Sequence, residues 1–231
     1  MTETQAREAI CRIGQSLFDR RLVHATAGNI SVRLDKGFLI TPTDACLGFL
    51  DPAKLSLLDA QGQHISGDKP SKTIALHRRI YDASAAFDAH TRCIIHTHST
   101  CCVALTLTHT DDATIRSTFA QEHELLPPIT PYFVMKVGHV PVIDYHRPGA
   151  PQAAEAVAQT ITRYGERGTP IRAVMLSRLG PNVWHQSPTS AMAVLEELEE
   201  TAKLMQQAQS PITPLNEKQI QELRETFGAK W

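Results

Sequence analysis

The sequence predicts an α/β protein whose sheet is mostly antiparallel. An amphipathic helical pattern opens the chain, short alternating runs fill the rest of its first third, and helices and single strands alternate after that. The strand-rich first third favours antiparallel pairing. Neither an internal repeat nor a flexible linker interrupts the 231 residues, so we expect one domain over residues 1–231, with a core over about 6–208.

The first half of the chain contains most of the expected strands. Apolar residues at helical spacing predict its helices, and alternation bounded by turn residues predicts its strands. These elements are expected as a helix over 5–22, strands at 30–34 and 38–41, a hairpin of 55–59 and 64–66, a helix from Pro70 and Ser71 to about 83, a short strand at 93–95 and a helix over 99–107.

The second half is expected to alternate between helices and single strands. Residues 108–124 are polar and match neither period, and three prolines impose extended or turn structure before 132–137. The later elements are expected as a strand at 140–143, an Ala-rich helix over 151–164, strands at 173–176 and 183–184, a helix capped by Ser187 and Pro188 that extends to about 208, and a C-terminal helix over about 216–226.

The composition is that of an ordinary soluble protein. The chain is 42% hydrophobic and 20% charged, with a formal net charge of −1, so it has no field that would attract nucleic acid or an anionic membrane. The first residues are polar, not a signal peptide, and no run of about 18 apolar residues occurs. The five cysteines form no Cys-x-x-Cys pair, which favours reduced thiols and a cytoplasmic location.

Two histidines follow the buried strand at 93–95. His96 and His98 are two residues apart, so in extended structure both imidazoles point to the same side. Two neutral imidazoles that converge suit a divalent transition metal, although a zinc site needs three or four ligands. Cys101 and Cys102 lie close by in sequence and are further candidate ligands.

Several motifs, taken together, resemble the class II aldolase/adducin family. The closest likeness is to its sugar-acid branch of 3-oxo-tetronate 4-phosphate decarboxylases, and it covers roughly residues 6–225. The motifs occur in the order Ala25-Thr-Ala-Gly-Asn-Ile-Ser-Val-Arg33, Ile40-Thr-Pro-Thr43, Gly67-Asp-Lys-Pro-Ser-Lys72, His96-Thr-His98, Pro131-Tyr-Phe-Val-Met135 and Glu196-Glu-Leu-Glu-Glu-Thr-Ala-Lys203.

The resemblance implies a zinc-dependent carbon–carbon lyase with a three-layer α/β/α fold. In the family, two histidines of His-x-His and a third histidine of an Asn-His-Gly turn hold the metal, which stabilises an enediolate. The resemblance further implies that His96 and His98 bind metal, and that Tyr132 donates a proton to the site of a neighbouring subunit in a homotetramer. The positions that correspond to the family's substrate-binding residues are Asn29, Thr43, Asp44, Ser71 and Lys72.

Three positions depart from the family pattern. Leu179 stands where the third metal-binding histidine is expected, beside Arg178 in the turn. Thr73 occupies the place of the catalytic acid/base carboxylate, and a hydroxyl cannot serve as a base near neutral pH. Asp44 replaces the glycine of a phosphate-binding turn, so its charge would repel a phosphate unless Lys72 offsets it.

These departures leave the metal and the substrate open. Zinc binding is expected to be weak or absent, and replacement ligands could come from Asp44 or from four other histidines. Those histidines are His24, His123, His146 and His185. Because of the charge of Asp44, a non-phosphorylated polyhydroxy acid fits the site better than a sugar phosphate, and Arg178 could add a positive charge.

Three interpretations of the function follow. The first is a metal-dependent lyase, an aldolase or decarboxylase, that acts on a small sugar acid or hydroxy-carbonyl compound, with or without a phosphate. The second is an adducin-like relative that binds a partner or metabolite without catalysis, because the carboxylate and the third histidine are replaced. The third is an enzyme of changed chemistry that uses Asp44 or Tyr132 as a base without metal.

Overall fold

The structure, a computed structural model that describes residues 1–108 and 124–231, is built around one eight-stranded sheet. Seven of its strands occupy segments where a strand is expected, and β8 begins at Gly180, three residues before the expected start. The strands are β1 (Asn29–Leu34), β2 (Gly37–Ile40), β3 (Ser56–Leu58), β4 (His64–Ser66), β5 (Cys93–His96), β6 (Val142–Ile143), β7 (Ala173–Leu176) and β8 (Gly180–His185).

The sheet has the strand order β4-β3-β2-β1-β5-β8-β7-β6. Every neighbouring pair is antiparallel except β6 and β7, which are parallel. The predicted α/β fold with a mostly antiparallel sheet is therefore confirmed.

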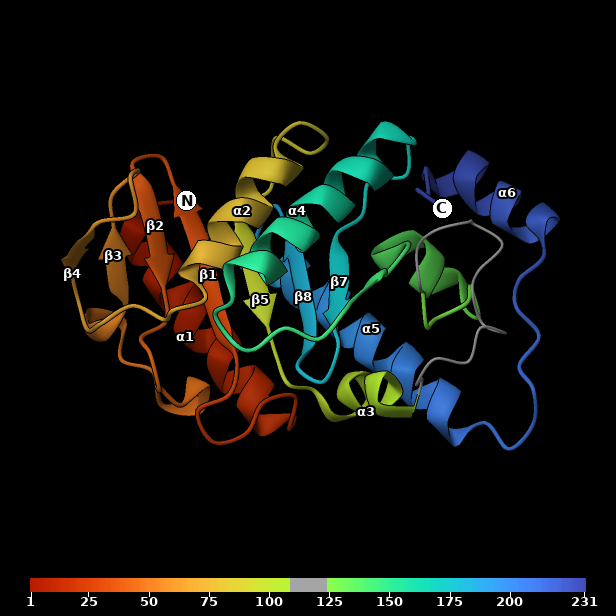
Figure 1. Cartoon of the computed structure of the whole chain (residues 1–231), viewed down its shortest axis with the longest axis horizontal. Helices are drawn as coiled ribbons and strands as arrows, with labels where there is room; N and C mark the ends of the chain where they lie inside the picture. The colour runs from red at the N-terminus through yellow and green to blue at the C-terminus, as the bar shows by residue number, and fades with distance from the viewer. Residues whose placement is uncertain (109–123) are drawn as a thin grey trace.

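Helices cover both faces of this sheet, which completes the three layers. Figure 1 shows α2 and α4 side by side on one face, with α1 and α5 on the other. The helices are α1 (Glu3–Asp19), α2 (Ile74–Ser84), α3 (Thr100–Thr108), α4 (Pro151–Glu166), α5 (Pro188–Gln207) and α6 (Glu217–Phe227), with short 3₁₀ turns η1 (Leu47–Phe49) and η2 (Pro52–Lys54) and a π-helical turn η4 (Phe133–Val137).

Most helices begin where the sequence predicts them. The side chain of Ser187 caps α5 by accepting a hydrogen bond from the backbone N–H of Ser190 at 3.1 Å. Helix α2 instead begins at Ile74, later than Pro70 and Ser71 predict. The polar segment 108–124, for which no element is expected, lies almost wholly outside the described residues.

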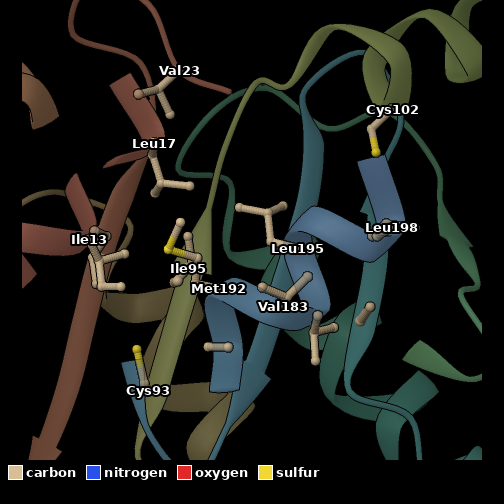
Figure 2. Close-up of a cluster of buried hydrophobic side chains, with 14 of the residues drawn as sticks. Ile13, Leu17, Val23, Cys93, Ile95, Cys102, Val183, Met192, Leu195 and Leu198 are labelled. Atoms are coloured by element: carbon tan, nitrogen blue, oxygen red, sulfur yellow. The ribbon is translucent and has the colours of Figure 1, made fainter. Parts of the chain in front are cut away.

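Strand β5 is buried on both faces, and its side chains alternate between two hydrophobic clusters. Ile95 packs with α1 and α5 residues such as Leu17 and Leu195, as Figure 2 shows. Ile94 points the other way, towards a cluster that includes Ile80 of α2. This double burial explains why the strand is a short apolar run without alternation.

The strand register places three polar residues in one row. Asn29 of β1 lies opposite His96 of β5, which in turn lies opposite Asn182 of β8. Directly opposed residues of antiparallel strands share a face of the sheet. This floor row (Asn29, His96, Asn182) therefore faces the α2 and α4 layer, on the same side as Ile94.

Within the described part of the chain, no helix is both long and apolar enough to span a bilayer.

Candidate active site

A cavity of about 780 Å³ opens above the floor row, where α2 and α4 begin. Its size suits a small metabolite. The structure brings almost all of the predicted site residues to this one cavity. Those in its lining are Asn29, Thr43, Asp44, Ser71, Lys72, Thr73, His96, His98 and Leu179. Tyr132 lies outside the lining and its side chain is 60% exposed.

One ring nitrogen of His96 is available to bind a ligand or a metal ion. Its Nδ1 lies 2.9 Å from the carbonyl oxygen of Pro181, which can only accept, so Nδ1 carries the proton. The lone pair of a neutral ring is then on Nε2. Burial, together with nearby His98, lowers the pKa of His96 to about 4, so the ring is neutral at ordinary pH. Burial and His24 lower the pKa of His98 as well.

Gly28 and Gly180 pack closely against the backbone of the His96–His98 segment. A Cβ atom on Gly28 would lie 2.8 Å from the carbonyl oxygen of His96, and one on Gly180 would lie 2.4 Å from that of Thr97. Both glycines have positive φ angles, +86° and +106°, which other residues rarely adopt. The two histidines are therefore held between backbone segments that allow little movement.

The histidine pair fits a divalent ion as two of its ligands. Imidazole rings that share a tetrahedral zinc stand about 5 Å apart, given Zn–N bonds of about 2 Å. The ring centroids of His96 and His98 are 5.0 Å apart. The ring of His24 is 6.5 Å from that of His98, too far to share the ion in this arrangement. Across residues 1–108 and 124–231, no group of three potential ligand side chains is close enough to hold a metal.

The other candidate ligands lie in different surroundings. His146 lines the cavity. His185, opposite Cys93 at the other end of β5, has its Nε2 3.1 Å from a nitrogen of Arg172. Cys102 is buried in the hydrophobic core, and neither it nor Cys101 lines the cavity. His123 is outside the described residues. Among the described residues, the site therefore has one fewer protein ligand than the three typical of catalytic zinc.

The three departures from the family pattern form part of the rim of the cavity, and we call them the rim residues (Asp44, Thr73, Leu179). Thr73 lies just before α2, and its hydroxyl is 2.8 Å from the Ser71 hydroxyl. The backbone N–H of Ile74 donates to the carbonyl of Ser71 at 3.1 Å. This turn delays the start of α2 to Ile74.

Two positions near the cavity have left-handed backbone conformations. Asp44 has a φ of 56° and Arg178 a φ of 66°. The family pattern has glycine and asparagine at these positions, and both tolerate this conformation better than most residues do. Arg178 is exposed and lies outside the cavity lining, so the structure does not support its expected role in substrate binding. In the described structure, Lys72 and Asp44 form no ion pair with each other.

Four cationic side chains line the cavity, and two of them have protein partners. Arg79 forms an ion pair with Glu155 at 2.6 Å, and Arg78 donates to the carbonyl of Gln61 at 2.8 Å. Lys72 and Arg147 have no ion pair or side-chain hydrogen bond with any described residue. Lys72 precedes α2 and Arg147 precedes α4, so each lies near the positive end of a helix dipole.

Comparison with known proteins places the chain in a family. A model of the family described as "Class II Aldolase and Adducin N-terminal domain" matches residues 8–206. The chain belongs to the class II aldolase and adducin family. This confirms the resemblance that the motifs indicate.

Relatives within the class II aldolase family include enzymes named for two reactions. A 3-oxo-tetronate 4-phosphate decarboxylase of Cupriavidus necator is 49% identical over 100% of this chain and 99% of its own length. An L-fuculose phosphate aldolase of Methanococcus maripaludis is 29% identical over 84% of this chain and 91% of its own. The crystal structure of YgbL from Klebsiella pneumoniae superposes with a TM-score of 0.80 at 38% identity, covering 97% of this chain and 100% of that one.

Two buried polar residues near the site were missed by sequence reasoning. His77 of α2 has its Nδ1 2.8 Å from the hydroxyl oxygen of Ser31, and its Nε2 has no hydrogen-bond partner among the described residues. Both polar side-chain atoms of Asn182 are likewise buried without a described partner. His77 could have been noticed because it lies one helical turn after Thr73. Asn182 gives no such local signal.

Glu199 differs from the exposed Glu200 beside it on α5. Its carboxylate is buried and accepts hydrogen bonds from the backbone N–H groups of Cys101 at 2.8 Å and Cys102 at 3.0 Å. These amides belong to the first turn of α3, which has no intrahelical partner for them. Glu199 thus caps the helix that follows His98.

Proposed function

We propose that this protein decarboxylates a 3-oxo sugar acid that carries a phosphate group. Full-length similarity to the decarboxylase of Cupriavidus necator supports the substrate class. The single observation that favours decarboxylation over aldol cleavage is Thr73, which stands where the family pattern has its acid/base carboxylate.

The two reactions differ in their need for a base. Aldol cleavage begins when a base removes the proton from the hydroxyl of the fragment that leaves as a carbonyl compound. Decarboxylation of a 3-oxo acid begins from a carboxylate that is already ionised near neutral pH. A site with threonine at position 73 has lost a base that aldol cleavage requires and that decarboxylation can do without.

The charges of the cavity support a substrate with an anionic group at each end. Lys72, with Asn29, Thr43 and Ser71, would hold the phosphate near the start of α2. Arg147, near the start of α4, would add positive potential that draws the anionic substrate into the cavity. The unpaired state of both cations in the described structure favours a ligand that supplies the missing negative charge.

The reaction conserves its atoms and electrons without an added reagent. The bond between the carboxyl carbon C1 and C2 breaks, its electron pair forms a C2–C3 double bond, and the C3 carbonyl oxygen becomes negatively charged as CO₂ leaves. The Thr73 hydroxyl would donate a hydrogen bond to that oxygen, and a proton then adds to C2. A divalent ion held by His96 and His98 would supply Lewis-acid polarisation at the same oxygen.

Tyr132 would provide that proton to a neighbouring copy of the chain, as the resemblance implies. Its high exposure and its position outside the cavity of its own chain support this role. Light scattering should then show a tetramer. Mixed assemblies of Tyr132→Phe and His96→Ala subunits should regain activity that each variant lacks alone. Failure to regain activity in such mixtures would contradict the shared site.

The proposed reaction is tested with 3-oxo-tetronate 4-phosphate labelled with ¹³C in its carboxyl carbon. We expect the wild-type protein to release labelled CO₂ and to leave L-fuculose 1-phosphate uncleaved. Aldol cleavage by the wild type at a comparable rate would overturn the argument from Thr73.

The non-catalytic alternative is favoured because Thr73 replaces the family's acid/base carboxylate and Leu179 replaces its third metal-binding histidine. A double variant, Thr73→Glu with Leu179→His, restores both expected groups. If only this variant released CO₂, the native chain would be a relative that has lost the reaction. Activity in the wild type that the double variant does not increase would exclude this alternative.

A further inference from the structure

We propose that Leu179 is a catalytic and specificity-determining residue, whose apolar side chain receives the substrate carboxylate and favours its departure as CO₂. The inference rests on the decarboxylase function proposed above. It assigns a positive role to a position that, by the family pattern, has only lost a metal ligand.

The turn between β7 and β8 places Leu179 next to the histidine pair. The backbone N–H of Leu179 donates to the carbonyl of Leu176 at 3.1 Å, which closes the turn. The next residue, Gly180, packs so closely that an added Cβ would lie 3.3 Å from the Cα of His98. Leu179 also lines the cavity, so its side chain is accessible to a substrate held beside the histidines.

Leu179 is part of a continuous apolar wall. Leu76 of α2 and Leu176 of β7 line the same cavity, and all three leucines pack in the hydrophobic cluster that includes Trp184. Leu179 is half-buried in this cluster, which restrains its side chain. Its neighbour Arg178 is exposed and outside the lining, so it places no charge on this wall.

An apolar wall beside the breaking bond disfavours the charged carboxylate of the substrate more than the neutral CO₂ that leaves. A carboxylate loses hydration when it is pressed against leucine side chains, which raises the free energy of the bound substrate. The products of the step are CO₂, which is neutral, and an oxyanion at C3, which the Thr73 hydroxyl and an ion on His96 and His98 would stabilise. Because charge leaves the wall during the step, the barrier falls. Polar groups at position 179 would stabilise the carboxylate and slow its loss.

The test compares Leu179→Gln with Leu179→Met, an apolar control of similar size. Single-turnover release of ¹³CO₂ should fall at least tenfold in Leu179→Gln, while KM stays equal or decreases. Leu179→Met should keep both constants within threefold of the wild type. The carboxyl ¹³C isotope effect should be at least as large in Leu179→Gln, because bond cleavage then limits the rate. A rate constant within threefold of the wild type, or a loss confined to a higher KM, would overturn the proposal.

A binding measurement separates this inference from the function on which it rests. The 3-hydroxy analogue of the substrate has the same carboxylate and phosphate but cannot decarboxylate. It should bind Leu179→Gln more tightly than it binds the wild type, and weaker binding would contradict the inference whether or not the wild type is active. A wild type that releases no CO₂ would overturn the proposed reaction itself. Thermal unfolding of each variant confirms that folded proteins are compared.

Discussion

The floor row and the rim residues of the cavity belong to different kinds of structure. The floor row sits on three paired strands, and the register of two strand pairs fixes each side chain against its neighbour. The rim residues sit in turns, where a change of side chain leaves strand pairing intact. All three departures from the family pattern fall on the rim, and both histidines of the paired motif persist.

Residues in the turns can therefore change function without loss of the fold. A shift of β5 by one residue would turn His96 to the opposite face and would carry the core residues Ile94 and Ile95 with it. Replacement of a turn residue has no such consequence.

Acid should destabilise the protein through two buried histidines, His96 of the floor row and His77 of α2. Burial, with a contribution from His96, lowers the pKa of His77 to about 3, and that of His96 is about 4. Below pH 6.5 the unfolded chain binds these protons while the folded chain does not, so stability falls as the pH drops towards 4. Each histidine contributes a slope of up to about 1.4 kcal/mol per pH unit.

Urea denaturation between pH 7 and pH 4.5, with chelator present, measures this effect. The slope should decrease in His77→Gln and stay unchanged in a variant of the exposed His90. Equal slopes in all three proteins would show that other groups control the acid sensitivity.

Removal of the Glu199 carboxylate should destabilise the protein at the first turn of α3, the helix that follows His98. Glu199→Ala leaves two backbone N–H groups of α3 without their partner, for an expected loss of about 1–3 kcal/mol in the free energy of unfolding. The control Glu200→Ala removes an exposed carboxylate from the same helix and should change stability by about 0.5 kcal/mol or less. Similar losses in both variants would mean that the cap contributes nothing specific.

A histidine restored to the rim should strengthen metal binding. In Leu179→His a third imidazole joins His96 and His98, and we expect at least a tenfold increase in affinity for Zn²⁺, measured by competition with a chromogenic chelator. The control Arg178→His adds an imidazole one residue away, outside the cavity lining, and should not change the affinity. An equal gain in both variants would exclude Leu179 as the missing ligand position.

The charge of Asp44 should have the smallest effect, because the side chain is exposed. Asp44→Asn keeps a residue that tolerates the left-handed backbone and removes one negative charge. We expect the KM for the phosphorylated substrate to fall about threefold, with no change in stability. The matched change Asp82→Asn, farther along α2 in the same cavity, should have less effect. The reverse order would place the phosphate elsewhere.

Most of the fold could be predicted because local patterns determine it. Apolar spacing locates α1, α4 and α5, and alternation locates β1 and β2. The start of α2 was predicted too early because the Ser71 and Thr73 hydroxyls contact each other and hold a turn ahead of the helix. Prolines predicted turns before residue 132, but the π-helical turn η4 has no signature in its residues.

The site was predicted less completely, because its details depend on contacts between distant segments. The motifs locate the cavity residues, and His96 and His98 point together as the strand period requires. Glu199 resembles the neighbouring glutamates in sequence and becomes buried only through the packing of α5 on α3. Asn182 joins the floor row through the pairing of β5 with β8, which no stretch of sequence near residue 182 indicates.

The cap formed by Glu199 links the position of α5 to the exchange of two backbone amides near the cavity. The amides of Cys101 and Cys102 are held by a carboxylate from another helix, and Gln206 of α5 also donates to the carbonyl of Cys101 at 2.6 Å. Hydrogen exchange at these two amides therefore reports the attachment of α5 to the segment after His98. Any assembly contact or substitution that displaces α5 would be visible there as faster exchange, three and four residues after the candidate metal ligand His98.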